Sequence, residues 1–221
     1  MRTRPVSLRT SALVFLALAL PPAHVQAQQP RLPRADGSMS VGWLHSNVSD
    51  MDHPYDSWAS RRATLNGQAG FYWTEHWKVE LGAERSTTQD RWQSSPVELS
   101  GGSVAYRVSE QHIQDTRLSI GQFYQFGHNA WAHLLLGGGL TVTLRHTVSD
   151  VQPLTRYDRN AVVVVEPGYS NSTDDTSVNP FAALAVKTYL TPRVFMRSDV
   201  QTDFRSNLQA VVLRIGFGVD F

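Results

Sequence analysis

The sequence predicts an all-β protein, an eight-stranded antiparallel up-and-down transmembrane β-barrel. Three observations predict this fold. Apolar side chains alternate with small or polar ones in eight segments, each of about ten residues, which is the length of a tilted membrane strand. The links between these segments are alternately short and long, and the last segment keeps its alternation up to Phe221. Successive side chains of a strand point to opposite faces, so each segment has one apolar face.

The first 27 residues have the features of a secretory signal peptide. Three arginines precede an apolar run at residues 11–20, which is too short to span a bilayer as a helix. Val25 and Ala27 supply the small residues that precede a cleavage site. We therefore expect an exported chain with a signal peptide at 1–27, a flexible lead-in at 28–37 and one barrel domain at 38–221.

Composition and charge exclude several other classes of protein. The absence of cysteine excludes a disulfide framework and thiolate metal sites. Removing the three arginines of the signal peptide changes the formal charge from +1 to −2, which gives no reason to expect a nucleic-acid partner. No apolar run long enough for a membrane-spanning helix follows residue 27. We expect no cofactor and no metal ion.

The strands follow one another at short intervals, which favours antiparallel pairing over βαβ units. The first strand places Met39, Val41 and Trp43 on one face, and Ser40 and Gly42 on the other. The later strands repeat this alternation. In chain order, the expected strands lie at residues 38–43, 64–73, 77–84, 114–126, 133–145, 181–190, 194–204 and 208–221.

The links between the strands carry a second signal. Tight connections are expected at residues 74–76, 127–130 and 191–193, where Pro192 suits a turn. Long polar links are expected at 49–61, 86–103 and 149–177. Short periplasmic turns and long outer loops are typical of outer-membrane barrels. The short seventh link, 205–207, departs from this pattern.

Alternation alone does not distinguish a membrane barrel from a soluble barrel with an apolar interior, such as a lipocalin. Two features favour the membrane barrel. The polar face is rich in glycine and carries charges of both signs, which suits a crowded interior. The apolar face carries aromatic side chains near its ends, as interfacial girdles do. These aromatic residues are Trp43, Trp73, Trp77, Tyr124, Phe126, Phe204 and Phe221.

An eight-stranded barrel is just wide enough for side chains to fill its interior. Buried charges are unfavourable unless they are paired, so we expect salt bridges across the interior. A plug of ion pairs and a narrow or gated pore remain the two alternatives. The charges expected inside are Lys78, Glu80, Glu84, Asp115, Arg117, Arg145, Lys187, Arg197, Asp199, Asp203, Arg214 and Asp220.

The terminal segment GFGVDF, residues 216–221, resembles the last strand of Gram-negative outer-membrane barrels. Together with the architecture, it makes residues 38–221 similar to the small barrels of the OmpA/OmpX/OmpW type. The resemblance implies a monomer surrounded by outer-membrane lipid and lipopolysaccharide, with roles from envelope integrity to adhesion. It also implies insertion by the barrel-assembly machinery, which would recognise Phe217, Val219 and Phe221. Unlike in full-length OmpA, no peptidoglycan-binding domain is expected after this strand.

Two regions outside the expected membrane strands could contact an extracellular partner. Val104, Tyr106 and Val108 share the parity of Leu118 and Ile120, so the third and fourth strands are expected to project beyond the bilayer, as in OmpX-like barrels. An exposed sheet edge can add a strand from a partner. The run 161–165 is either a short hairpin strand or an aggregation-prone contact site. Four aromatic residues of the long links are candidates for binding: Tyr55, Trp58, Trp92 and Tyr157.

An enzyme is the weaker alternative. Some eight-stranded barrels modify lipid A, and His45, Ser46 and Asn47 superficially resemble a deacylase grouping. Adjacent residues of a strand face opposite sides, so the hydrogen bond between base and nucleophile is not expected. His112, His133 and His146 lie on separate strands without evident convergent carboxylates. We therefore expect no catalytic residues.

Overall fold

A computed structural model describes residues 34–47, 60–99, 104–126, 131–158 and 161–221 of the chain. The described residues belong to one compact unit, Arg31–Phe221. The expected signal peptide, most of the lead-in and the turn at 127–130 lie outside them. Among the described residues, no helix is long and apolar enough to cross a membrane.

All regular structure in the described residues is β-strand, and neighbouring strands of the main sheet pair antiparallel. The strands are β1 (Ala35–Ser46), β2 (Ser60–Tyr72), β3 (Trp77–Ser86), β4 (Gln89–Glu98), β5 (Val104–Phe126), β6 (Ala132–Val151), β7 (Leu154–Asp158), β8 (Ala161–Glu166), β9 (Tyr169–Tyr189), β10 (Val194–Phe204) and β11 (Leu208–Asp220).

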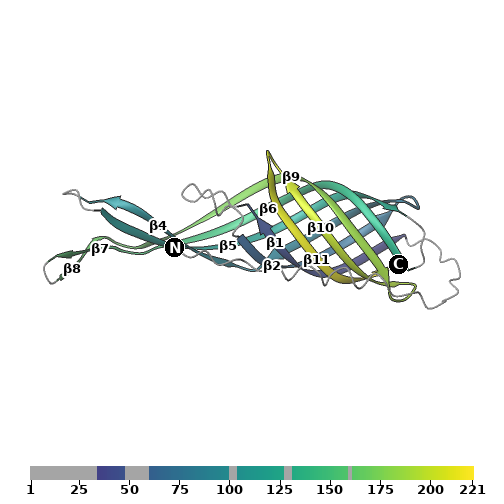
Figure 1. The fold of residues 1–221 in the computed structure, drawn as a ribbon, viewed down its shortest axis with the longest axis horizontal. Coiled ribbons are helices and arrows are strands. Elements are labelled where there is room, and N and C mark those ends of the chain that lie inside the picture. The colour runs from purple at the N-terminus through teal and green to yellow at the C-terminus, as the bar shows by residue number, and fades with distance from the viewer. Residues whose placement is uncertain (1–33, 48–59, 100–103, 127–130, 159–160) are drawn as a thin grey trace, which may run out of the picture. The chain divides into compact units, whose positions relative to one another are not determined.

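Eight of these strands form a closed ring (Figure 1). Their order is β3-β2-β1-β11-β10-β9-β6-β5, and β3 pairs with β5 to close it. The closing register runs from Trp77 opposite Tyr124 to Arg85 opposite Thr116. Closure leaves no open edge in this part of the sheet, so every strand is hydrogen-bonded on both sides. The prediction of eight antiparallel strands in a barrel is therefore confirmed.

The two faces of the ring differ in chemistry as the alternation predicts. The face turned away from the interior is covered by exposed large apolar side chains, among them Leu65, Leu81, Ile120, Leu136 and Ile215. The interior-facing residues are the buried ones, and most of them are polar or charged. A water-soluble barrel would have the reverse arrangement. The apolar belt therefore matches a lipid environment.

The short turns agree with the sequence. In the β2–β3 turn, the Thr74 hydroxyl accepts hydrogen bonds from the backbone N–H groups of His76 and Trp77. Thr191 accepts in the same way from Arg193 and Val194 in the β9–β10 turn. We call the end of the barrel that carries these two turns the turn end.

Most of the described residues in the links at 86–103 and 149–177 are β-strand, so the expectation of long loops there was wrong. β4 lies within the first link and pairs with β5 from Gln89 opposite Ile113 to Glu98 opposite Val104. β6 and β9 continue to pair up to Val151 opposite Tyr169. Both regions lie in water on both faces, so their strands lack the apolar alternation that reveals a membrane strand.

We call this projecting sheet the extension, and it contains β4, residues 104–113 of β5, 145–151 of β6 and 169–175 of β9. It lies at the opposite end of the barrel from the two short turns (Figure 1). The expected projection of the third and fourth strands is thus present and is larger than predicted. Residues 161–165 belong to β8, which pairs with β7 in a separate hairpin. Of the two alternatives for this run, the hairpin strand is the one observed.

Candidate functional site

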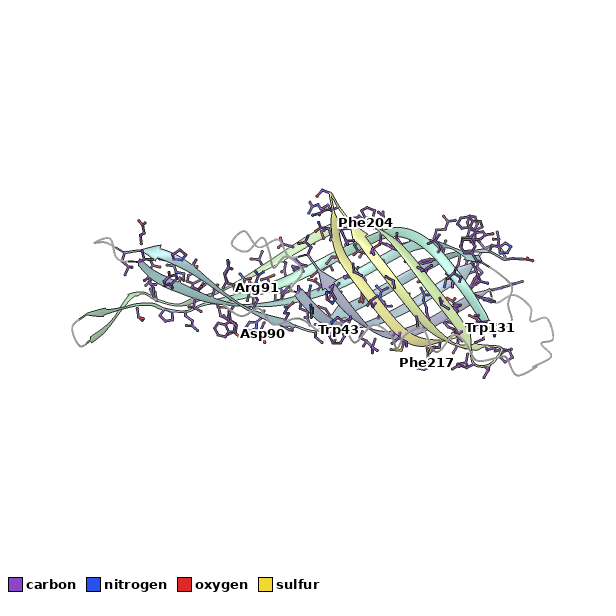
Figure 2. The ribbon with its side chains drawn as sticks, in the orientation of Figure 1. Trp43, Asp90, Arg91, Trp131, Phe204 and Phe217 are labelled. Atoms are coloured by element: carbon purple, nitrogen blue, oxygen red, sulfur yellow. The ribbon has the colours of Figure 1, made fainter. Side chains whose placement is uncertain are left out.

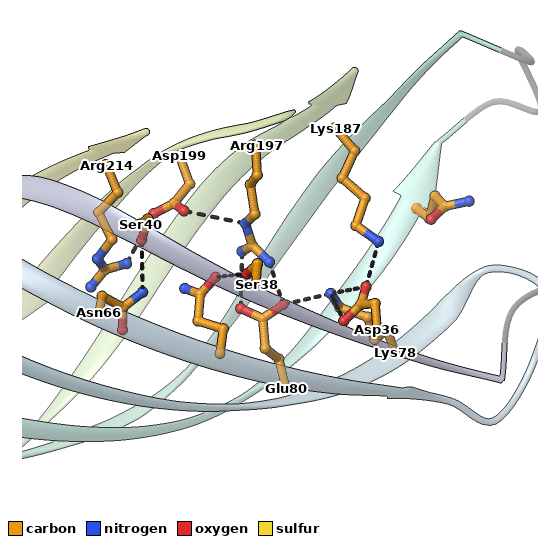
Figure 3. A network of polar contacts seen from close by, with 12 residues as sticks. Asp36, Ser38, Ser40, Asn66, Lys78, Glu80, Lys187, Arg197, Asp199 and Arg214 are labelled. Atoms are coloured by element: carbon orange, nitrogen blue, oxygen red, sulfur yellow. Dashed lines mark hydrogen bonds and ion pairs between the residues drawn. The ribbon is translucent and has the colours of Figure 1, made fainter. Parts of the chain in front are cut away.

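The barrel interior holds a continuous chain of alternating acidic and basic side chains. Figure 3 shows the part of this chain that lies between Arg214 and Lys187. Each member contacts the next by a salt bridge, and the residues come from six strands, β1, β3, β5, β9, β10 and β11. In order, the chain runs Asp203, Arg117, Glu84, Arg214, Asp199, Arg197, Glu80, Lys78, Asp36, Lys187 and Asp220.

Two arginines hold the middle of this chain. Arg197 makes a bidentate contact with Glu80, with Nη1 and Nη2 lying 2.7 and 2.9 Å from the two carboxylate oxygens. Arg214 Nη2 lies 2.9 Å from Glu84 Oε2, and its Nη1 lies 2.9 Å from Asp199 Oδ1. Charge-assisted bidentate pairs of this kind fix the geometry of both partners. The strands on opposite sides of the barrel are thereby tied together across the interior.

At the turn end, two buried lysines converge on Asp36. Lys78 Nζ lies 2.9 Å from Asp36 Oδ2 and 2.6 Å from Glu80 Oε2. Lys187 contacts Asp36 as well, and its Nζ lies 3.0 Å from Asp220 Oδ1 and 3.0 Å from the Tyr72 hydroxyl. Each ammonium therefore has at least two oxygen partners, which is the condition under which a buried charge is tolerated.

Gly70 provides the space for this cluster. A Cβ atom at position 70 would lie 2.3 Å from Asp36 Oδ1 and 2.9 Å from Lys78 Nζ. Gly218 has a similar role, because a Cβ there would lie 2.2 Å from the ring of Phe195. Phe195 is fully buried, and Lys187 Nζ lies 4.0 Å from its ring centroid. The glycines of the interior face thus make room for large neighbours.

A second, smaller cluster lies nearer the extension. Asp115 accepts hydrogen bonds from both Arg62 and Arg145, at 2.6 Å from Arg62 Nη2 and 2.9 Å from Arg145 Nε. Arg62 is buried and also donates to the Ser46 hydroxyl. Arg145 is partly exposed, with 28% of its side-chain surface accessible. This cluster fills the interior at the level where the extension begins.

The twelve charges expected inside all lie on the interior side, eleven of them buried and Arg145 partly exposed. Two further buried charges, Asp36 and Arg62, were missed. Asp36 lies in the expected lead-in, yet β1 begins at Ala35. Arg62 lies just before the expected second strand, whereas β2 begins at Ser60. The sequence offered one signal for them. Asp36 lies two residues before Ser38, and Arg62 lies two residues before Thr64, so each shares the interior face of its strand with that residue.

Adding these two residues keeps the charges of the described interior residues balanced. The acids are Asp36, Glu80, Glu84, Asp115, Asp199, Asp203 and Asp220, and the bases are Arg62, Lys78, Arg117, Arg145, Lys187, Arg197 and Arg214. Seven acids thus face seven bases, and each of the fourteen takes part in a salt bridge.

The deacylase-like grouping does not form a catalytic pair. Ser46 is buried on the interior face and accepts from Arg62, while His45 lies on the opposite face of β1. The expectation that the histidines have no convergent carboxylates was wrong for His112 and His146, however. His112 Nδ1 lies 2.6 Å from Asp90 Oδ1, and His146 Nδ1 lies 2.6 Å from Asp174 Oδ1. Both pairs lie in the extension and were hidden by the wrong assignment of its strands as loops.

The remaining predicted residues fall in two groups. Phe217, Val219 and Phe221 point outward from the last strand, and Phe217 is labelled on this surface in Figure 2. Trp92 lies exposed on β4, and Tyr157 belongs to β7. Tyr55 and Trp58 lie outside the described residues.

Comparison with known proteins places these features in a family. Residues 10–221 match the family described as outer membrane protein beta-barrel domain. No curated protein matches the sequence. The solved structures that resemble the chain share its fold at low sequence identity.

Three of these structures are outer-membrane proteins. OprG of Pseudomonas aeruginosa is 13% identical with a TM-score of 0.50, over 86% of this chain and 97% of that one. Ail of Yersinia pestis, solved in complex with the heparin analogue sucrose octasulfate, is 13% identical with a TM-score of 0.48, over 85% and 99%. The N-terminal β-barrel domain of Pseudomonas aeruginosa OprF is 11% identical with a TM-score of 0.47, over 86% and 98%.

Proposed function

Because the chain belongs to the outer membrane protein beta-barrel domain family and lies in the outer membrane, we propose that it is a non-enzymatic anchor for a β-sheet exposed at the cell surface. The barrel supplies a rigid, closed support. The extension supplies the surface available for binding or for support of the envelope. Short turns mark the periplasmic side of such barrels, so the extension faces outward.

The observation that carries this proposal is the neutral set of interior ion pairs, which consists of the ion-pair chain and the Asp115 cluster. Among the described residues, this set contains seven acids and seven bases, all of them paired. A water-filled passage would have to displace several of these contacts, and exposing one member would leave its partner buried and unpaired. The ion-pair chain therefore supports a plug and opposes a narrow pore for small solutes.

The position of the polar groups also opposes an enzyme that modifies lipid A. Such an enzyme would need a base and a nucleophile within hydrogen-bond reach of each other on the lipid-facing side. His45 and Ser46 point to opposite faces of β1. The charged groups described in the interior are engaged in salt bridges, and the outer face of the barrel carries exposed apolar side chains.

We further propose that the protein is a monomer in contact with outer-membrane lipid and lipopolysaccharide, inserted by the barrel-assembly machinery. Phe217, Val219 and Phe221 lie on the outward face at the end of the chain, where this machinery would recognise them. The partner of the extension would be extracellular.

The proposal is tested in cells that carry either the full chain or a variant in which a short turn joins Ser86 directly to Ile113. The full chain and the shortened variant should both assemble, as judged by heat-dependent migration on a detergent gel, because the β3–β5 pairing is retained. Adhesion or envelope sensitivity should change only in the shortened variant, with lipid A unchanged by mass spectrometry. A different acyl-chain number in the presence of the full chain would contradict the non-enzymatic role.

A further inference from the structure

The outer face of the extension has an unusual combination of acidic and aromatic side chains. We define this acidic face by Asp90, Trp92 and Glu98 of β4, Tyr106, Glu110 and His112 of β5, and Asp150 of β6. Along each strand, these residues alternate with residues on the other side of the sheet, which we call the reverse face. In β4, exposed and less exposed residues alternate without a break from Gln89 to Glu98.

The two faces of the extension differ in charge. The reverse face carries three arginines and Asp175, and two of these arginines are paired with acids, Arg107 with Glu166 and Arg145 with Asp115. Arg91, Arg107 and Arg145 lie on the reverse face, and Figure 2 shows Asp90 and Arg91 on opposite sides of β4. Among the described residues of the extension, no lysine or arginine lies on the acidic face. Arg85 of β3 lies where the acidic face meets the barrel, and the Arg85 guanidinium donates a hydrogen bond to the side chain of Gln114. Charges of one sign are thus gathered on one side of a thin sheet.

The packing of the acidic face brings like charges together. Glu110 lies directly opposite Asp150 in the β5–β6 register, and like charges in that position destabilise a sheet. His112 stands between Asp90 and Asp150, with its Nε2 at 3.5 Å from Asp150 Oδ2. One imidazolium can offset only part of three carboxylates. The face therefore keeps a net negative charge, which a cationic partner would neutralise.

Aromatic side chains lie among these carboxylates and are well exposed. Trp92 is 60% accessible and lies directly opposite Glu110, and Tyr106 is 67% accessible and lies opposite Pro96. A guanidinium or ammonium group over an indole or phenol ring is attracted by the ring, and the effect adds to that of a nearby carboxylate. Trp92 and Glu110 together offer both kinds of contact to one cationic side chain.

We propose that the acidic face is a docking surface for a polypeptide segment rich in arginine or lysine. The proposal rests on the surface-binding role argued above and names the class of partner. Cationic side chains would contact the carboxylates of Asp90, Glu98, Glu110 and Asp150 and stack on Trp92 and Tyr106. Such contacts select a partner by its positive charge and by its ability to stack on aromatic rings, and they require no deep pocket.

The test uses the full chain in lipid nanodiscs of uncharged lipid and a short oligoarginine peptide, with an oligoglutamate peptide of equal length as the opposite probe. We expect oligoarginine to bind, oligoglutamate not to bind, and the affinity to fall steeply with added salt. The Glu110→Gln and Trp92→Ala variants should each weaken binding about three- to fivefold, because each removes one exposed contact.

A matched control separates this face from net charge alone. Glu75→Gln removes one negative charge in the exposed β2–β3 turn at the other end of the barrel, and should leave the affinity unchanged. Equal effects of Glu110→Gln and Glu75→Gln, or no binding of oligoarginine, would overturn the proposal. The shortened variant that lacks β4 tests the surface-binding role separately from the cationic partner. An adhesion defect in that variant without oligoarginine binding by the full chain would leave the surface role in place and refute the cationic partner.

Discussion

Lys187 of β9 forms a buried ion pair with Asp36 of β1, although 151 residues separate them in the chain. The contact joins the first strand of the ring to the strand that precedes the last hairpin. Lys78 of β3 forms an ion pair with the same carboxylate, so β1, β3 and β9, none of which are neighbours in the ring, meet at Asp36. The interior charges thus fix how the closed ring is packed across its centre, in addition to the backbone pairing along its circumference.

Arg214→Ala should destabilise the barrel strongly. The change leaves Glu84 and Asp199 with fewer cationic partners in a buried setting. Breaking a buried pair from one side typically costs about 3–5 kcal/mol. The measurement is the temperature at which the unboiled gel band is lost. Arg205→Ala, in the exposed β10–β11 turn, is the matched control and should have little effect. Equal midpoints for both variants would refute a structural role of the ion-pair chain.

Gly70→Ala should disturb the cluster at the turn end. The added methyl group would lie 2.3 Å from Asp36 Oδ1, so the carboxylate and Lys78 must move apart. Overpacking of this kind typically costs about 1–3 kcal/mol. Gly67→Ala on the same strand is the control, because a Cβ there meets nothing within 4 Å. The same heat-dependent gel compares the two, and an unchanged Gly70→Ala midpoint would contradict the tight packing described here.

Phe221→Ala should lower the amount of protein in the outer membrane. The Phe221 backbone is paired with Ala35, so a change of its side chain leaves the strand pairing available and removes the terminal aromatic group. Phe71→Ala, another exposed phenylalanine on the lipid-facing side, is the control for lost apolar surface. Immunoblots of outer-membrane fractions should show depletion for Phe221→Ala alone. Equal levels of both variants would exclude a special role for the last residue.

The extension should be more stable at mildly acidic pH than at alkaline pH. The hydrogen bond to Asp90 raises the pKa of His112 above its ordinary value, and the nearby Glu110 and Asp150 act in the same direction. A raised pKa means that the protonated form stabilises the folded state. This contribution is fully present below the unfolded-state pKa and is lost as the pH rises through the folded-state pKa.

Hydrogen exchange of the β4 amides measures this effect. Compared at about pH 6 and about pH 8, after correction for the intrinsic rate, protection should fall with rising pH in the native chain. His112→Gln should abolish the pH dependence without affecting the amides of β10. A pH dependence that persists in His112→Gln would assign the titration to another group.

The barrel and its interior charges could be predicted because period-two alternation determines which residues share a face. The interior location of Lys78, Arg197 and Arg214 follows directly from their neighbours in the chain, because the adjacent apolar residues face outward. Asp36 and Arg62 could not be identified, since they lie at strand ends where no apolar residue marks the strand. The partners of each charge also depend on how the strands are staggered around the ring, and alternation does not determine that stagger.

The extension was underestimated for a related physical reason. Trp92 and Tyr106 lie in strands that water surrounds on both sides, so neither face needs to be apolar. The links around Asp90 and Asp174 therefore have the composition of loops although their backbones form ladders. Consequently the pairs of His112 with Asp90 and of His146 with Asp174 became evident only from the register.

The ion pairs of the interior are proposed to fill the barrel and close it to ions. The most direct test is the electrical conductance of the purified full chain in a planar lipid bilayer at neutral pH. A plug held by Arg197 with Glu80 and by Arg214 with Glu84 predicts insertion without steady currents. Large, steady, ion-selective currents from the native chain would contradict the plug and establish a pore.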